Sequence, residues 1–257
     1  MNKRIYKPFV FLGIFILLVG AACLSSSSEP APPTPTALPE PTDVPEPTEL
    51  PVAEDVVIPT EEPSEALAYY IEEFEPDTTT SDNWLWFTTS GDENKFDLYT
   101  ENGKLIFDLQ GTNLYTYYVY DPYIYTDVRL DTKAENRGKN TNNVGLLCRI
   151  SDDGWYEFSI ANNGLWEIWA YDGYEEKYTS LASGGSTAIN MKKGTNEFSI
   201  ICNGNRLSLF INGVETHVME ERNFVFREGQ VGIGVSSFDV LPINIEVDWI
   251  AIGEITN

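Results

Sequence analysis

From about Ala66 to the C-terminus, short runs of Val, Ile, Leu, Phe, Tyr and Trp recur roughly every 8 to 12 residues, between turn residues. This spacing is typical of an antiparallel all-β fold. No long stretch has the period of an amphipathic helix. The turn signals are pairs that readily adopt the positive φ angles of tight hairpins, namely Asn102-Gly103, Asn163-Gly164, Asn203-Gly204, Asn212-Gly213, Asp153-Gly154 and Asp172-Gly173.

Within these runs, side chains alternate between the two faces of each predicted strand. In the run Arg206–Ile211, we expect Leu207, Leu209 and Ile211 to share one face. In the run Ile124–Leu130, alternation predicts one face that carries Ile124, Thr126, Val128 and Leu130. About 190 residues are available for one core. The sequence therefore predicts an all-β sandwich, in which two antiparallel sheets pack face to face.

The N-terminus has the composition of an export signal. Lys3, Arg4 and Lys7 precede an apolar run from Phe9 to Val19, which is shorter than the roughly 20 residues of a membrane span. We expect residues 1–22 to act as a signal peptide.

The stretch Val19-Gly20-Ala21-Ala22-Cys23 resembles the lipobox of bacterial lipoprotein signal peptides, although Gly20 stands where that family has a branched apolar residue. The resemblance implies that Cys23 is diacylated, becomes the mature N-terminus and anchors the chain to the cell membrane or cell surface. The alternative is an ordinary secretory signal, cleaved near Ala22, which leaves Cys23 without a role.

Residues 23–65 have a different composition. From Leu24 to Glu65 the chain contains eleven of its fifteen prolines, ten acidic residues and no Lys or Arg. Such a segment cannot bury enough apolar surface to fold, so we expect a disordered, extended linker between the anchor and a domain of residues 66–257. A ligand for a proline-recognition module is the alternative.

The net charge of −24 limits the partners of the chain. It argues against nucleic acid and anionic lipid head groups, so contact with the membrane is expected through the lipid anchor alone. Neutral and cationic ligands are compatible with this charge, and solubility is its simplest explanation. We expect the domain to act as a monomer.

Cys148 and Cys202 remain as a pair if Cys23 carries the lipid. Outside the cytoplasm they could form a disulfide, or each could remain a small buried hydrophobe. The sequence leaves both open, because pairing requires Cα atoms within about 7 Å. The only histidine, His217, lies in a strand-like run and is expected on a solvated face rather than beside a catalytic cysteine.

Four segments spread over the domain carry a resemblance to a known fold. They are Glu72-Glu73-Phe74 followed by Asn83-Trp84, the segment Gly145–Phe158, the hairpin Asn203–Gly213, and the closing run Gly229–Gly234 with Val247-Asp248-Trp249. Their order resembles the concanavalin A-like, or laminin G-like, jelly-roll family. The resemblance implies a two-sheet jelly roll but no activity, because this family contains binding modules, enzymes and spacers.

Glycoside hydrolysis requires two carboxylates across the scissile bond. The family 16 glucanases of this group carry them in the order Glu, any residue, Asp, any two residues, Glu. The nearest match here starts at Glu246 and Asp248 but has Ala251 in place of the second Glu. It also lies on the closing strand, which we expect at a sheet border. No catalytic residue is therefore predicted.

The resemblance also implies a structural calcium ion between the first and last strands, held by carboxylates and backbone carbonyls. Glu73 and Asp248 are the matching positions, with Glu72 as a substitute. A solvated acidic edge is the alternative, and no other cofactor is expected.

Aromatic residues are dense between Trp155 and Tyr178. Sugar rings dock on aromatic faces, but aromatic residues are also ordinary strand formers. We expect Phe158 and Trp166 in the core. The residues flanked by turns are expected to form an exposed ligand-binding platform, which consists of Trp155, Trp169, Tyr171 and Tyr174.

The sequence therefore favours a surface-anchored lipoprotein whose jelly roll binds a glycan or another extracellular polymer without catalysis. Two alternatives remain open: a divergent glycoside hydrolase, and a structural or protein-interaction domain without affinity for sugars. Joint exposure of Trp155, Trp169 and Tyr171 on a concave sheet favours binding, whereas their burial favours the interaction domain.

Cells grown with a radioactive fatty acid are expected to label the wild-type chain and the control Ser25→Ala but not Cys23→Ala, because the lipid is attached to the Cys23 thiol. Autoradiography of the purified protein measures the label. Full labelling of Cys23→Ala would contradict the predicted anchor.

Overall fold

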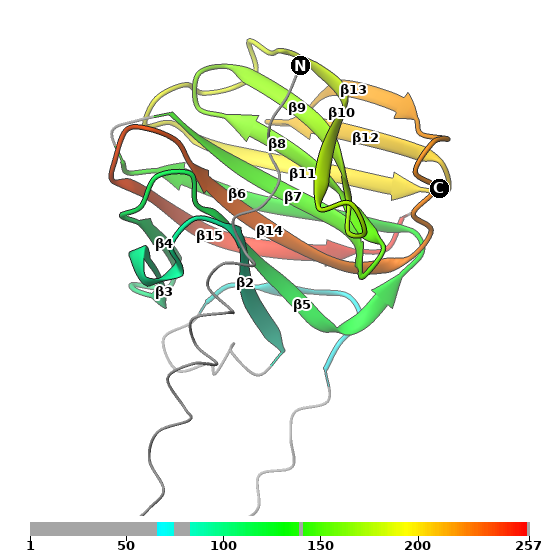
Figure 1. Cartoon of the computed structure of the whole chain (residues 1–257), viewed down its shortest axis with the longest axis horizontal. Helices are drawn as coiled ribbons and strands as arrows, with labels where there is room; N and C mark the ends of the chain where they lie inside the picture. The colour runs from blue at the N-terminus through cyan, green and yellow to red at the C-terminus, as the bar shows by residue number, and fades with distance from the viewer. Residues whose placement is uncertain (1–65, 75–82, 139–140, 256–257) are drawn as a thin grey trace, which may run out of the picture. The chain divides into compact units, whose positions relative to one another are not determined.

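Short strand-forming runs make up most of the regular structure of the computed structural model, which describes residues 66–74, 83–138 and 141–255 (Figure 1). These residues form fifteen strands and one 3₁₀ turn, Glu93–Lys95, and the pairings between these strands are antiparallel. The described part contains no helix long and apolar enough to cross a membrane. The expected signal peptide, Cys23 and the expected linker lie outside the described residues.

The strands form two sheets. The eight-stranded sheet has the order β13 (Val214–Glu220), β12 (Arg206–Ile211), β11 (Thr195–Asn203), β6 (Val128–Asn136), β15 (Ile243–Gly253), β4 (Leu105–Leu109) and β3 (Phe96–Thr100), and β1 (Tyr70–Glu72) also pairs with β15. The seven-stranded sheet has the order β10 (Lys177–Gly185), β9 (Leu165–Asp172), β8 (Gly154–Ala161), β7 (Asn142–Ser151), β14 (Gly229–Ser237), β5 (Tyr115–Tyr125) and β2 (Trp84–Ser90). The predicted two-sheet jelly-roll sandwich is confirmed.

The core lies between the sheets and is filled by alternate side chains of both. Leu207, Leu209 and Ile211 are fully buried there, as predicted, and so are Phe158 and Trp166 within a few per cent. Burial of one such aliphatic side chain stabilises the fold by about 1.5–3 kcal/mol. The face of each strand that points away from the core is therefore not required for core packing.

Two sequence-based expectations fail for topological reasons. The run 124–130 is not one strand, because the chain bends at Thr126 and Asp127 between β5 and β6; Ile124 is consequently 61% exposed while Val128 and Leu130 are buried. Strand β15 is not at a sheet border either. It lies between β6 on one side and β4 and β1 on the other.

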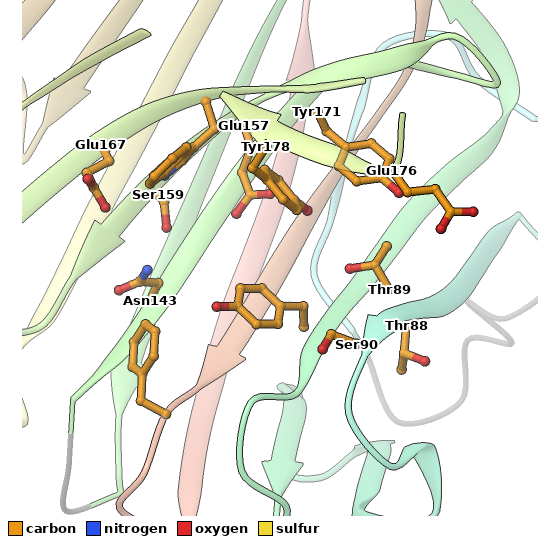
Figure 2. A pocket seen from close by; sticks show the side chains of 13 residues that line it. Thr88, Thr89, Ser90, Asn143, Glu157, Ser159, Glu167, Tyr171, Glu176 and Tyr178 are labelled. Atoms are coloured by element: carbon orange, nitrogen blue, oxygen red, sulfur yellow. The ribbon is translucent and has the colours of Figure 1, made fainter. Parts of the chain in front are cut away.

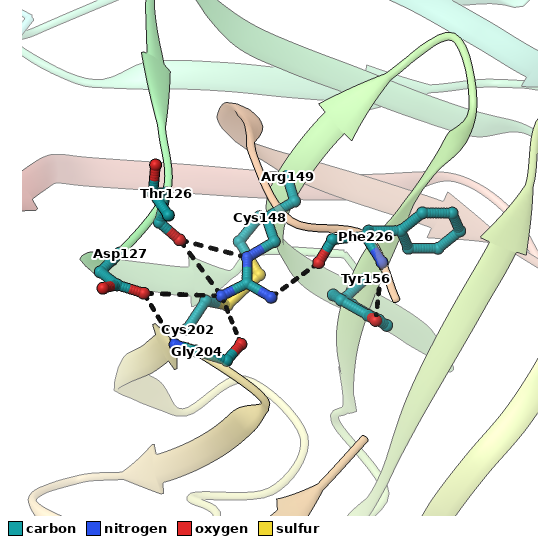
Figure 3. The surroundings of a disulfide bond; sticks show 8 residues. All are labelled: Thr126, Asp127, Cys148, Arg149, Tyr156, Cys202, Gly204 and Phe226. Atoms are coloured by element: carbon teal, nitrogen blue, oxygen red, sulfur yellow. Dashed lines mark hydrogen bonds and ion pairs between the residues drawn. A yellow bond between two sulfur atoms is a disulfide. The ribbon is translucent and has the colours of Figure 1, made fainter. Parts of the chain in front are cut away.

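A disulfide joins Cys148 on β7 to Cys202 on β11 and thus links the two sheets, with Cα atoms 6.7 Å apart (Figure 3). The next residue, Arg149, has a φ of 59° and a buried guanidinium. A buried charge requires hydrogen-bond partners, and Arg149 donates to the backbone carbonyls of three separate turns or loops, those of Thr126, Gly204 and Phe226. The disulfide and the guanidinium of Arg149 together stabilise this end of the sandwich.

Three tyrosine hydroxyls of β5 hold the first described residues against the domain. Tyr123 donates to the carbonyl of Ala66, Tyr120 to that of Leu67 and Tyr125 to that of Ala68, at 2.8, 2.7 and 2.5 Å. The chain is thereby fixed before β1 pairs with β15.

Reduction of the disulfide in the otherwise unchanged chain is expected to lower the free energy of unfolding by about 2–4 kcal/mol, because the link closes a long loop in the unfolded chain. Urea unfolding with and without reductant measures the difference. The double variant Cys148→Ala, Cys202→Ala is the control, whose midpoint must not respond to reductant. The same midpoint for the wild type in both buffers would contradict a stabilising link.

Candidate functional site

The outer face of the seven-stranded sheet is determined by what its strands give to the core. On β8 the core takes Tyr156, Phe158 and Ile160, so alternation turns Trp155, Glu157 and Ser159 outward. On β9 the core takes Trp166, Ile168 and Ala170. The strand register then pairs Glu157 with Trp169, Ser159 with Glu167, and Trp155 with Tyr171 across the outer face.

This outer face is concave. Strands β10 and β5 are separated by four strands, which would place them about 24 Å apart in a flat sheet, yet the hydroxyl oxygens of Tyr178 and Tyr117 are 2.5 Å apart. The hairpin of β9 and β10 therefore curls over its own sheet, as Figure 1 shows.

Under the hairpin lies a second, smaller hydrophobic cluster, formed by Tyr117, Val119, Leu147, Ile150 and Trp155. Tyr171 stacks on the Trp155 ring with centroids 4.0 Å apart. One half of the concave face is thus filled by side chains.

The other half is open. A cleft of about 690 Å³ lies there, and Figure 2 shows polar side chains from several strands around it. Its lining combines hydroxyls, one amide, three carboxyls and aromatic rings: Thr88, Thr89, Ser90, Tyr115, Asn143, Glu157, Ser159, Glu167, Trp169, Tyr171, Glu176, Tyr178 and Phe238.

Glu157 is the most buried carboxyl of the cleft, with 5% of its surface exposed. The Tyr117 hydroxyl donates a 3.1 Å hydrogen bond to its Oε2 atom, and Tyr178 in turn contacts the Tyr117 hydroxyl. Burial raises the pKa of Glu157 to about 7, because desolvation of the carboxylate outweighs the hydrogen bond from Tyr117. Partial burial also raises the pKa of Glu167.

Glycines on the neighbouring strands leave room for this arrangement. A Cβ atom at Gly234 on β14 would lie 2.7 Å from Cδ1 of Tyr117, and one at Gly145 on β7 would lie 3.2 Å from Oε1 of Glu157. A side chain at Gly234 would therefore displace the tyrosine that holds the carboxyl.

The structure separates the four residues of the predicted platform. Trp169 and Tyr171 line the cleft, half-buried. Trp155 was expected to be exposed, but it is buried because Tyr171 and the curled hairpin cover it. Tyr174 is 97% exposed in the β9–β10 turn and does not line the cleft. Sequence reasoning missed Glu157, whose only signal was a charge within the otherwise uncharged strand run Trp155–Ile160.

The residues expected to bind calcium lie elsewhere. Glu73 is exposed, and Asp248 on β15 forms an ion pair with Lys133, Oδ2 to Nζ at 2.8 Å. Among the described residues, no group of three or more His, Cys, Asp or Glu side chains is arranged to hold a metal ion. Calcium binding, which can also use backbone carbonyls, stays a prediction.

The incomplete glucanase-like motif is also remote from the cleft, since Glu246 and Asp248 belong to the eight-stranded sheet. Glu246 pairs there with Arg137 and Lys104, and Asp248 with Lys133. His217, expected on a solvated face, is half-buried and packs against the Trp166 ring at 4.8 Å.

Known structures share this architecture, whereas no family model and no curated protein matches the sequence. The carbohydrate-binding module CBM66 from Bacillus subtilis aligns with a TM-score of 0.51 at 11% identity, over 66% of this chain and 95% of the module. The β-glucanase of Bacillus licheniformis gives 0.51 at 10%, over 72% and 98%. A mixed-linkage glucan GH16 protein of Bacteroides ovatus, solved in complex with a product, gives 0.53 at 9%, over 72% and 99%.

These similarities define the class of fold. The domain is a concanavalin A-like jelly-roll sandwich, as the sequence resemblance implied. Identities of 9 to 11% show the fold alone, so any function has to be argued from the cleft itself.

Glu157→Gln is expected to abolish most of the loss of stability that the wild type shows as the pH rises from 4.5, the ordinary pKa of Glu, to about 7, because glutamine stays uncharged. The folded state holds the proton more tightly than the unfolded chain, so stability is greatest below this window and falls by roughly 3 kcal/mol across it. Urea unfolding at pH values on either side of the window measures the loss. Glu176→Gln, at the exposed rim, is the control and should leave the difference unchanged; an unchanged difference in Glu157→Gln would contradict the assignment.

Proposed function

We propose that this protein is a lipid-anchored surface protein whose jelly roll binds a glycan, or another extracellular polymer, in the cleft of the seven-stranded sheet without catalysing a reaction on it. The observation that carries the proposal is the cleft, in which the rings of Trp169 and Tyr171 lie among hydroxyl, amide and carboxyl groups. Aromatic faces receive the apolar faces of sugar rings, and fixed polar groups orient their hydroxyls. Ligand sites in proteins are commonly concave and aromatic, with a few positioned polar groups.

The anchored location rests on the sequence, where Cys23 follows an export signal and a proline-rich, acidic linker follows Cys23. A lipid at Cys23 would hold the domain at the surface, and the linker would let the cleft reach a polymer outside it.

A divergent glycoside hydrolase is the second candidate, favoured by one observation. Glu157 has the raised pKa that a general acid needs, and Glu167 lies in the same cleft. We rank binding first, because Glu157 is almost completely buried and already hydrogen-bonded to Tyr117, which leaves it poorly placed to protonate a leaving group. Shortening of a bound glycan, abolished in Glu157→Gln, would reverse this ranking.

Trp169→Ala is expected to weaken binding of the best ligand on a glycan array at least about tenfold, which corresponds to about 1.4 kcal/mol, because it removes an aromatic wall of the cleft. Titration calorimetry with that ligand measures the affinity. Tyr174→Ala removes an aromatic ring outside the cleft and is the matched control, expected to bind like the wild type. Absence of binding to every glycan would favour a structural or protein-interaction domain instead.

A further inference from the structure

The cleft contains an excess of negative charge without any positive side chain. Glu157, Glu167 and Glu176 line it, and its lining includes no Lys, Arg or His. An adjoining pocket shares Asn143, Glu167 and Phe238 with the cleft and likewise has no basic residue in its lining. The cleft and this adjoining pocket therefore share an acidic border at Glu167.

Some carboxylates of the eight-stranded sheet have basic partners, whereas others, such as Asp97, Asp108 and Glu197, take part in no ion pair in the part of the chain that the structure describes. On the eight-stranded sheet, Asp248 pairs with Lys133, Asp131 with Arg129, and Glu246 with Arg137 and Lys104. Within the described residues, none of the three cleft carboxyls takes part in an ion pair. The chain has 16 basic residues and 40 acidic ones, and none of the basic residues lines the cleft.

Among the described residues, these carboxyls do not form a group of three or more side chains that could hold a metal ion. The aromatic lining points to a different cation. Tyr115, Trp169, Tyr171, Tyr178 and Phe238 lie around the same space. An ammonium group is attracted to the face of an aromatic ring, and the attraction grows when both are removed from water.

Glu157 adds an independent indication. It is 95% buried and points toward the cleft in Figure 2, and the side chains whose polar contacts lower its pKa, Tyr117, Trp155 and Tyr178, are all uncharged. A buried carboxylate is destabilised unless a positive charge accompanies it. A ligand that brings an ammonium group into the cleft would supply that charge.

We infer that the cleft binds a glycan that carries free amino groups, with the ammonium groups placed among the three glutamates and the aromatic rings. This inference rests on the proposed function and names the chemistry of its ligand. The hydroxyl and amide groups of Thr88, Thr89, Ser90, Ser159 and Asn143 favour a sugar over a lysine-rich peptide, because they offer partners for ring hydroxyls. Glycans that carry carboxylate or sulfate groups would be repelled.

The test compares two oligosaccharides that differ only in the amine, a glucosamine hexamer and its fully N-acetylated counterpart. The full-length protein is titrated with each in a slightly acidic buffer, in which the amines are protonated. Glu157 is then largely protonated in the free protein, so binding of an ammonium group is expected to release its proton. We expect the amine-bearing hexamer to bind at least about tenfold more tightly, and we expect salt to reduce the difference.

The triple variant Glu157→Gln, Glu167→Gln, Glu176→Gln should lose the discrimination. The control Glu101→Gln, Glu215→Gln, Glu228→Gln removes the same charge from exposed positions outside the cleft and should retain it. If the triple cleft variant fails to fold, the pair Glu167→Gln and Glu176→Gln provides the comparison, with a smaller expected loss.

Equal or tighter binding of the acetylated hexamer, or of a neutral glucan, would overturn the inference and leave the proposed function intact. Failure of every oligosaccharide to bind would contradict both this inference and the proposed function. Binding of hexalysine as tightly as the glucosamine hexamer would show that the cleft selects positive charge rather than an amine-bearing sugar, and would also overturn the inference.

Discussion

The alternation of strand β8 is the constraint on which the cleft depends. Because Tyr156, Phe158 and Ile160 are held in the core, the residues between them can only face outward, which brings Glu157 and Ser159 to the concave side. The curl of the sheet then divides that side. Where Tyr178 meets Tyr117, the curled hairpin closes over a second hydrophobic cluster, and the uncovered remainder is the cleft. The same strands therefore determine both the packing of the core and the geometry of the cleft.

Stability alone does not explain the presence of Glu157. A carboxyl buried beside a hydrophobic cluster destabilises the folded state once it ionises, and the rest of the sandwich, with its large core and inter-sheet disulfide, has to offset that cost. Tyr117 and Tyr178 hold the carboxyl in one place, and Gly234 leaves space for the Tyr117 ring. Ionisable groups with strongly shifted pKa values cluster at functional sites, which agrees with a binding role for this cleft.

Local patterns in the sequence predicted the fold well, because the Asn-Gly turns and the alternation in runs such as Arg206–Ile211 act over a few residues. They failed where the outcome depends on distant strands. Burial of Trp155 depends on Phe87 of β2 and Tyr117 of β5, whose rings pack against it, and pairing of Cys148 with Cys202 depends on the distance between two sheets. The bend at Thr126 and Asp127 has no glycine or proline to mark it, so Ile124 was wrongly expected on the same face as Val128 and Leu130.

The placement of charge argues that the acidity of the chain has more than one origin. Ion pairs such as Lys133 with Asp248 are partly exposed and contribute little to stability, so their main effect is to neutralise part of the charge on the outer face of the eight-stranded sheet. Solubility would be served by leaving that broad, solvated face charged. The cleft differs, because its carboxyls lie without a basic neighbour in a confined and partly desolvated space, where burial raises the pKa values of Glu157 and Glu167. A ligand that brings positive charge into the cleft accounts for these carboxyls better than solubility does.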